Sequence, residues 1–225
     1  MFGLSDIQNV LQQFFIVSVS FAAIVWIGVF ILKWKLPFLI GRSGEKFVSK
    51  KLSDLDPIKY TILDNLMLPS DGNISTTQVD HVVVSNFGIF VIETKSYSGW
   101  IFGNAYQRNW TQVIYRYKKK FYNPLYQNYA HTKALETLIR PFYPKLPIIG
   151  FVAFPSAEKL QVSGTNAVGQ ARDIVRKIQS YTTEIISDAD KTNVVEILTA
   201  YNLKDKQTRT SHLKSARNLK RARGF

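Results

Sequence analysis

The sequence predicts an α/β protein, in which helices flank a mixed β-sheet and one hydrophobic helix precedes them. Three observations predict it. Runs rich in β-branched residues alternate with segments of helical periodicity. Residues 147–154 form an almost wholly apolar run that is typical of a strand buried on both faces. One uncharged stretch near the N-terminus is long enough to cross a bilayer, and it leaves roughly 190 of the 225 residues for a globular domain.

The N-terminal helix is predicted from residues 7–32, which include no charged residue. As a helix, the densest apolar part, Phe14–Leu32, spans roughly 28 Å, close to the thickness of the hydrocarbon core. The alternative is a cleaved signal peptide, but that favours a basic start and a shorter apolar run. We therefore expect residues 1–36 to form a retained anchor that contacts the membrane through residues 7–32.

Flanking charge predicts the orientation of this anchor. Asp6 is the one charged side chain before the apolar stretch, whereas the residues that follow it include Lys33, Lys35, Arg42 and Lys46. Because positive residues stay on the cytoplasmic side, the sequence predicts a single-pass membrane protein with its C-terminal domain in the cytoplasm.

The remaining elements follow in chain order. Pro37 and Gly41 indicate a short linker, and residues 41–55 have the apolar spacing of a helix with Ser43 as its N-cap. Strands are predicted at 60–68, 78–84, 89–95 and 147–154, further strands or an extended excursion within 99–117, and helices at 123–140, 171–185 and 190–203. This order predicts a core domain over residues 37–160, a helical part over 161–203 and a basic tail over 204–225.

Composition restricts the chemistry. The chain has no cysteine, which excludes disulfides, thiolate zinc sites and cysteine nucleophiles, and it has only three histidines. A bound metal would therefore be held mainly by oxygen, which favours magnesium, manganese or calcium. The net charge of +13 favours polyanionic partners, either nucleic acid or anionic lipid.

The clearest hairpin surrounds residues 85–88. If Gly88 adopts a positive φ and Val84 lies opposite Ile89, then Asp80 lies opposite Glu93, and a second pair, Gln78 and Lys95, shares their face. A register shifted by one residue would split this group between the two faces.

Two opposed carboxylates repel each other, and apolar neighbours make the site partly dry. A divalent cation would relieve the repulsion, and Lys95 would orient the attacking water or stabilise charge on a phosphate. Spacing alone equally allows a surface hairpin whose acids and lysine form an ordinary ion pair.

A family resemblance favours the first interpretation. The runs Gly41–Glu45, Gln78–Ser85 and Gly88–Lys95, followed by Ser98-Gly99 and by Asn123-Pro124 with Gln127 and His131, resemble the nuclease-related domain (NERD) family in the expected order over roughly residues 41–155. That resemblance implies the PD-(D/E)xK nuclease superfamily, with its α/β nuclease core over residues 37–160. It also implies hydrolysis of phosphodiester bonds, DNA as the substrate and Mg²⁺ or Mn²⁺ as the cofactor.

The resemblance also implies roles for individual residues. Asp80 and Glu93 would hold the metal, Glu45 of the first helix would complete the metal shell, and Lys95 is the lysine of the E-x-K motif. Gln78 precedes the metal-binding aspartate, where Val79 replaces the proline usual in the superfamily. Gln127 would contact the nucleic acid or the site.

Other polar residues have weaker signals. His81 should face away from Asp80 and pack within the sheet, while His131 could lie at the site or on a helix surface, and Asp64 could support the site. Basic and aromatic residues interleave over 116–122, so we expect Arg116, Lys118, Lys119 and Lys120 to contact nucleic acid. The tail 204–223, part of it helical, would bind nucleic acid or anionic lipid.

Two other functions remain open. A non-catalytic, membrane-tethered nucleic-acid-binding protein would need the anchor and the basic segments but no intact acid and lysine set. A membrane scaffold for protein partners would need no acid cluster.

Overall fold

The structure is a computed structural model that describes residues 4–70 and 75–222. The chain divides into two compact units, residues 1–42 and 43–225, and each is considered by itself. Residues 71–74, between the predicted strands at 60–68 and 78–84, lie outside the described residues. The predicted domain boundaries at residues 36, 160 and 203 stay predictions.

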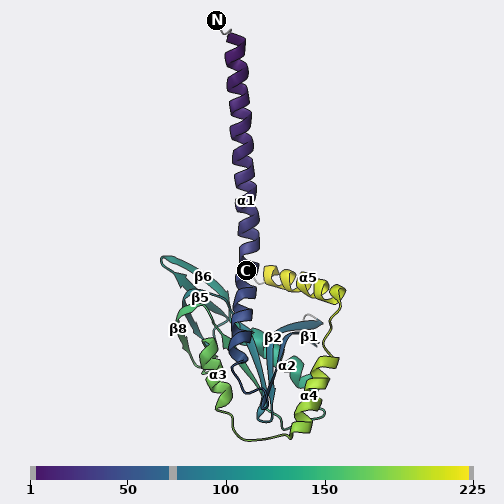
Figure 1. The fold of residues 1–225 in the computed structure, drawn as a ribbon. Helices are drawn as coiled ribbons and strands as arrows, with labels where there is room; N and C mark the ends of the chain where they lie inside the picture. Colours follow the sequence, from purple (N-terminus) through teal and green to yellow (C-terminus); the bar gives the residue numbers. More distant parts are fainter. Residues whose placement is uncertain (1–3, 71–74, 223–225) are drawn as a thin grey trace. The chain divides into compact units, whose positions relative to one another are not determined.

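Helix α1 (Leu4–Leu52) includes the predicted hydrophobic segment. Its most apolar 18-residue window has a mean hydropathy of 2.7, and the side chains there are exposed. Within the part of the chain that the structure describes, this is the one helix long and apolar enough to cross a membrane (Figure 1).

The predicted linker at Pro37 and Gly41 is wrong, because both residues are helical within α1. A proline inside a helix removes one backbone hydrogen bond and costs about 3 kcal/mol, which is why its position suggested a break. Ser43 is consequently an interior helical residue and not an N-cap.

A five-stranded mixed sheet forms the centre of the second unit, in the order β1-β2-β3-β7-β9. The first three strands are antiparallel, and β7 and β9 continue the sheet in parallel. The strands are β1 (Tyr60–Pro69), β2 (Thr76–Ser85), β3 (Gly88–Thr94), β7 (Ile148–Ala153) and β9 (Val168–Gly169).

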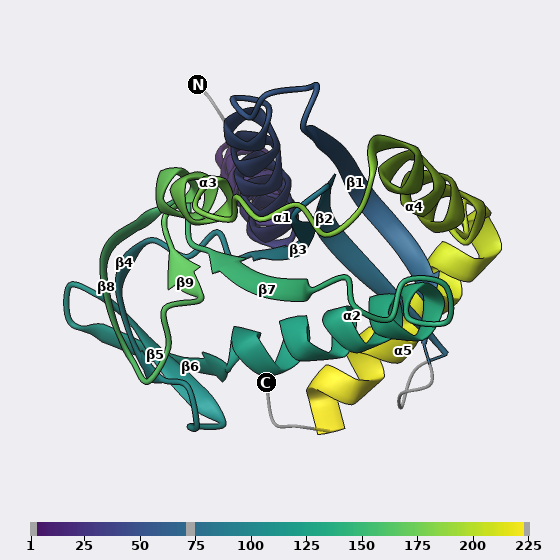
Figure 2. The same ribbon diagram turned by 90° about the horizontal axis from the view of Figure 1, so that it is seen from below.

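Helices cover both faces of this sheet, as the α/β prediction requires (Figure 2). On one face, α2 (Pro124–Ile139) and α4 (Asp188–Ala200) pack on the valines and isoleucines of β2 and β3. On the other face, α3 (Ala171–Gln179) and the last turns of α1 pack on Phe90 and Ile92. The central strands are therefore almost fully buried.

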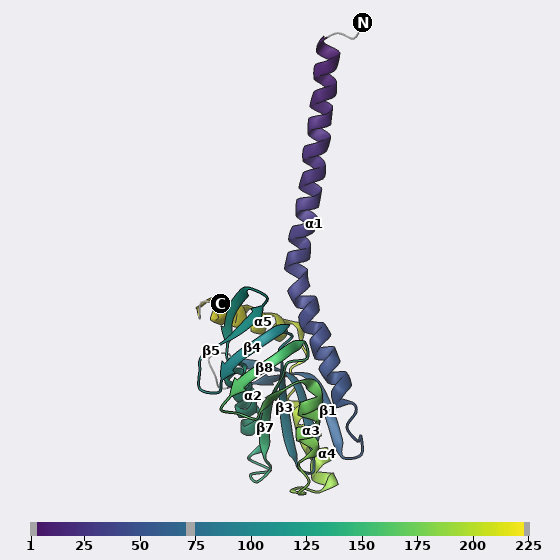
Figure 3. The same ribbon diagram turned by 90° about the vertical axis from the view of Figure 1, so that its left-hand side faces the viewer.

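A second, four-stranded sheet has the order β6-β5-β4-β8. It lies beside the five-stranded sheet (Figure 3). One of its faces packs through Ile101, Trp110 and Phe121 against Val152 and Phe154 from the β7 segment. Its strands are β4 (Gly99–Asn104), β5 (Asn109–Ile114), β6 (Tyr117–Tyr122) and β8 (Ala157–Ser163). Strands β8 and β9 were not predicted from the sequence.

The C-terminal segment forms α5 (Lys206–Ala222), which confirms that part of the basic tail is helical. Its His212 lies 3.0 Å from the Thr76 hydroxyl, measured from Nδ1. The tail is thereby linked to the first residue of β2.

Candidate active site

The predicted hairpin register is confirmed. Val84 pairs with Ile89, and Ser85 pairs with Gly88 around a two-residue turn. Gly88 has the expected positive φ, 153°, and a Cβ at this position would lie 3.0 Å from the Pro147 carbonyl oxygen. Glycine therefore permits both the turn and the close approach of the chain that leads into β7.

This register places the two acids across from each other. The ladder between β2 and β3 ends at the pair His81 and Ile92, and one further step in the same register reaches Asp80 and Glu93. The Thr94 backbone N–H donates to Asp80 Oδ2 at 2.8 Å. The Asp80 carboxylate is thereby held at the end of β3, beside the Glu-Thr-Lys motif.

Glu93 is the centre of a buried polar cluster, and only 2% of it is exposed. Lys95 Nζ donates to Glu93 Oε1 at 2.5 Å, and His131 Nε2 lies 3.0 Å from Glu93 Oε2. His131 Nδ1 lies 2.6 Å from the hydroxyl of Thr77. Each carboxylate oxygen of Glu93 thus has a nitrogen partner from a different element.

The two carboxylates differ in electrostatic environment. Burial, and next the charge of Glu93, raise the pKa of Asp80 well above its usual range. Burial also acts to raise the pKa of Glu93, but the Lys95 charge and the His131 hydrogen bond outweigh it and lower the pKa to about 2. Negative charge on Glu93 is therefore compensated, whereas Asp80 lies in a position that favours a further cation.

Helix α2 supplies the other side of the cluster. Asn123 caps the helix by accepting from the Leu125 N–H at 2.9 Å, and Pro124 opens it, as the sequence predicted. Gln127 and His131, one turn apart, then lie on the same helix face. Lys95 Nζ donates to Gln127 Oε1 at 2.8 Å, so the lysine joins β3 to α2.

Gln78 does not lie where the sequence predicted. Strict alternation would put it on the face of Val82, yet Val79 and Val82 pack in the same hydrophobic cluster although they are three residues apart. The alternation changes where Asn65 of β1, at a φ of 57°, interrupts the pairing opposite Asp80. Gln78 Nε2 consequently donates to Asn65 Oδ1 at 2.9 Å and is directed toward β1, not toward Lys95.

Thr77 is a site residue that the sequence analysis missed. The same change of face brings its hydroxyl to His131, and no alternating pattern could reveal that contact. His131, for which a helix-surface position was an alternative, is buried and contacts Glu93.

Glu45 approaches the site from α1. Its charge contributes to the raised pKa of Asp80, after the effects of burial and Glu93. Gly44 packs directly on the Ser96 side chain, where a Cβ would overlap the serine Oγ. Within residues 4–70 and 75–222, no three acids or histidines are close enough to form a metal cluster, so Glu45 as a third ligand stays a prediction.

His81 packs on the opposite side of β2 from the acids, as predicted. Its Nδ1 lies 2.7 Å from Asp64 Oδ1, and its Nε2 lies 3.2 Å from the Thr94 hydroxyl. Asp64 also accepts a hydrogen bond from Ser49 of α1 at 2.5 Å. Asp64 thus contacts His81, and His81 contacts Thr94, the residue between Glu93 and Lys95. In this way Asp64 supports the segment that carries the site.

The predicted nucleic-acid-binding lysines belong to the four-stranded sheet and not to the acid cluster. Lys118, Lys119 and Lys120 are exposed on the edge strand β6, and Arg116 is exposed in the turn before it. Because side chains alternate along a strand, Lys118 and Lys120 share one face, while Lys119 shares the other with buried Phe121.

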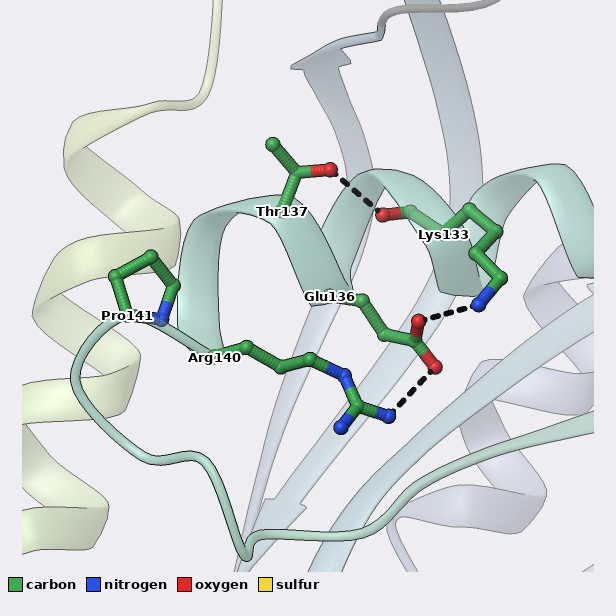
Figure 4. A pocket seen from close by; sticks show the side chains of 5 residues that line it. All are labelled: Lys133, Glu136, Thr137, Arg140 and Pro141. Carbon is green, nitrogen blue, oxygen red and sulfur yellow. Dashed lines mark hydrogen bonds and ion pairs between the residues drawn. The ribbon is translucent and has the colours of Figure 1, made fainter.

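A surface hollow of about 470 Å³ lies along α2, away from the acid cluster. Glu136 in this hollow accepts from Lys133 at 2.7 Å and from Arg140 at 3.1 Å (Figure 4). Lys133 and Arg140 share the carboxylate of Glu136, so part of the positive charge of the hollow is already compensated.

Comparisons with known proteins identify the family. The model of the nuclease-related domain, NERD, matches residues 40–155. The chain belongs to the NERD family. An uncharacterized protein of Bacillus anthracis is 36% identical over 187 residues, which cover 83% of this chain and 85% of that protein.

A solved structure also matches weakly. The crystal structure of a protein of unknown function, AF1548, covers 79% of this NERD chain and 96% of its own, with 13% identity and a TM-score of 0.29.

Proposed function

We propose that this protein is a membrane-anchored nuclease of the PD-(D/E)xK superfamily that hydrolyses phosphodiester bonds in DNA with Mg²⁺ or Mn²⁺. Membership of the NERD family supports nuclease-related chemistry. The observation that carries the proposal is the convergence of Asp80, Glu93 and Lys95 at the end of one hairpin.

The donor set fits a hard divalent cation. Asp80 and Glu93 supply carboxylate oxygens, and burial with the charge of Glu93 raises the pKa of Asp80 in spite of the Thr94 N–H and the Lys95 charge, so a further cation would stabilise its anion. Asp80 and Glu93 would hold the ion, and Glu45 would complete its shell. When bound, such an ion polarises a phosphoryl oxygen and lowers the pKa of water.

The protein's own side chains have separate roles in this proposal. Lys95 would orient the attacking water and stabilise charge on the phosphate, and Gln127 would fix the position of the ammonium group. His131 would keep the Glu93 carboxylate in place through its bond to Oε2.

Cleavage by the purified full-length chain tests the proposal. In neutral detergent it should cut DNA with Mg²⁺ or Mn²⁺, and EDTA should stop this. Replacing Lys95 with alanine should lower the rate by roughly 10²–10³-fold, the loss typical of removing one electrostatic stabiliser. Asp80→Asn should do the same.

Exposed residues of the same type provide matched controls. Asp54→Asn and Lys133→Ala should retain the wild-type rate, because Asp54 and Lys133 form exposed ion pairs outside the site. Equal cutting by wild type, Asp80→Asn and Lys95→Ala would overturn the proposal. Binding of DNA with no metal-dependent cleavage would favour the non-catalytic, membrane-tethered alternative.

We further propose that residues 43–225 face the cytoplasm. The chain has no cysteine, so a single Ser163→Cys substitution on exposed β8 provides a unique label site. A membrane-impermeant maleimide should label it in inverted membrane vesicles but not in intact cells. Labelling in intact cells would show that residues 43–225 face the outside, opposite to the proposal.

A further inference from the structure

We infer that the outward face of the four-stranded sheet binds single-stranded nucleic acid by stacking its bases on Trp100 and Phe102. We call this face the platform, defined by Trp100 and Phe102 of β4, Lys118 and Lys120 of β6, and Lys159 of β8. The inference rests on the proposed function only in taking nucleic acid as the ligand.

Strand register places these five side chains on one face. Trp100 pairs with Val113 of β5 on one side and with Lys159 of β8 on the other, and Val113 pairs with Lys118. One step along, Phe102 pairs with Thr111, which pairs with Lys120. Partners in a register share a face, so the two aromatic rings lie between lysines on both edge strands.

The opposite face of the sheet is the buried one. Ile101, Trp110 and Phe121 alternate with the platform residues and pack into the core. Trp100, in contrast, is 45% exposed, although large aromatic side chains usually contribute to cores. Trp100 thus presents part of its ring to solvent on the face opposite the core.

Ring geometry favours separated bases over a duplex. The centroids of Trp100 and Phe102 are 6.3 Å apart. That is nearly twice the spacing of about 3.4 Å between successive nucleotides in a duplex strand. Bases on neighbouring rings must therefore be unstacked from each other, as in single strands bound on an aromatic sheet face.

Charge on this part of the chain favours a polyanion. Between Glu93 and Glu136 the sequence has no acidic residue but seven lysines and arginines, so β4, β5 and β6 contain no acid. The nearest acid on β8 is Glu158, at the irregularity beside Lys159. Lys159 Nζ lies over one face of the Trp100 ring, 4.7 Å from its centroid, so a base would stack on the other face while the ammonium contacts a phosphate.

Binding of a short oligonucleotide tests the inference. The full-length chain with Asp80→Asn, in phosphatidylcholine nanodiscs, is titrated with fluorescein-labelled dT12 and with a twelve-base-pair duplex. Trp100→Ala should weaken dT12 binding roughly tenfold, a typical loss for one base–aromatic stack, and leave duplex binding unchanged. Trp100→Phe should retain most of the affinity, because a ring remains.

Further variants separate stacking from charge and from misfolding. Lys118→Gln with Lys120→Gln should weaken dT12 binding and reduce its salt dependence. Phe142 and Lys145 are exposed on the connection between α2 and β7. Phe142→Ala and Lys145→Gln should therefore change neither the dT12 affinity nor its salt dependence. Unchanged dT12 affinity in a Trp100→Ala chain that melts like wild type would overturn the inference, and so would an equal loss for the duplex.

Two outcomes distinguish this inference from the proposed nuclease activity. Trp100-dependent dT12 binding without cleavage by the wild type would support the platform and reject the nuclease. If the wild type cleaves DNA and its dT12 binding does not depend on Trp100, the platform is rejected and the nuclease proposal stands. Trp100-dependent binding of phosphatidylserine vesicles, with no binding of dT12, would overturn the platform in favour of a lipid surface.

Discussion

The two sheets of residues 43–225 differ in where they carry charge. The five-stranded sheet is covered by helices on both faces, and its polar cluster of Glu93, Lys95 and His131 is paired within the protein. The four-stranded sheet is covered on one face only, and its lysines on β6 are exposed. One sheet therefore holds its charged groups in a fixed, buried geometry, and the other leaves its charged groups accessible to solvent.

This difference teaches how burial and function are divided. Burying a carboxylate is costly unless it is paired, so Glu93 exists in the core only because two nitrogens contact it. An exposed lysine needs no such partner and contributes little to stability. Changes in the first sheet should affect both folding and chemistry, while changes on the platform should affect binding alone.

The largest expected effect is the loss of stability when the packing between the two sheets is removed. Phe154 is fully buried and its ring stacks on Trp110 at 6.2 Å, next to Phe121. Phe154→Ala should lower the free energy of unfolding by about 3–5 kcal/mol, the usual cost of such a cavity. Trp100→Ala, also an aromatic truncation but on the exposed face, should cost no more than about 0.5 kcal/mol.

Urea unfolding followed by circular dichroism measures both values. Similar losses for the two variants would contradict the assignment of one buried and one exposed face to the four-stranded sheet.

A smaller effect is expected for the histidine that positions Glu93. His131→Ala should lower metal-dependent cleavage by about 10–100-fold and shift its Mg²⁺ dependence to higher concentration, because the Glu93 carboxylate loses its contact to α2. His131→Gln, whose amide can still donate, should recover part of the loss. Titration of the rate with Mg²⁺ measures the shift; an unchanged Mg²⁺ dependence in His131→Ala would mean that the histidine is structural only.

The smallest effect concerns the junction where β6 leads into α2. Asn123 caps α2, and its Nδ2 donates to the carbonyl oxygens of Ala105 at 3.0 Å and Gln107 at 2.8 Å. Asn123→Ala should cost about 1–2 kcal/mol of stability, whereas Asn109→Ala, exposed on β5, should be nearly neutral. Thermal melts of the two variants compare them directly, and equal melting temperatures would show that the cap contributes nothing.

The sequence predicted the parts of the site that depend on local pattern. The turn at Gly88 and the apolar residues on each side were enough to predict the hairpin register, and that register brings Asp80 and Glu93 to the same end of the hairpin. The Asn-Pro start of α2 predicted the helix that supplies Gln127. Both features depend only on residues that are close in sequence.

The features that the sequence analysis missed depend on distant contacts. Gln78 was assigned to the wrong face because Asn65, on another strand, interrupts the alternation of β2. Strand β8 has the polar sequence of a surface segment and forms only by pairing with β4. Whether His131 lies at the site depends on which face of α2 meets β3, and helical periodicity does not distinguish faces that are both partly polar.

Gly44 lets the backbone of α1 lie directly against Ser96, with no side chain between them. A Cβ at residue 44 would lie 2.9 Å from Ser96 Cβ as well, so either Ser96 or the helix would have to shift to accept a larger residue. Glu45 follows Gly44 directly, so the distance of Glu45 from the acids depends on the absence of a side chain at residue 44. The activity that remains when residue 44 carries a larger side chain would thus report how closely Glu45 must approach the other two acids.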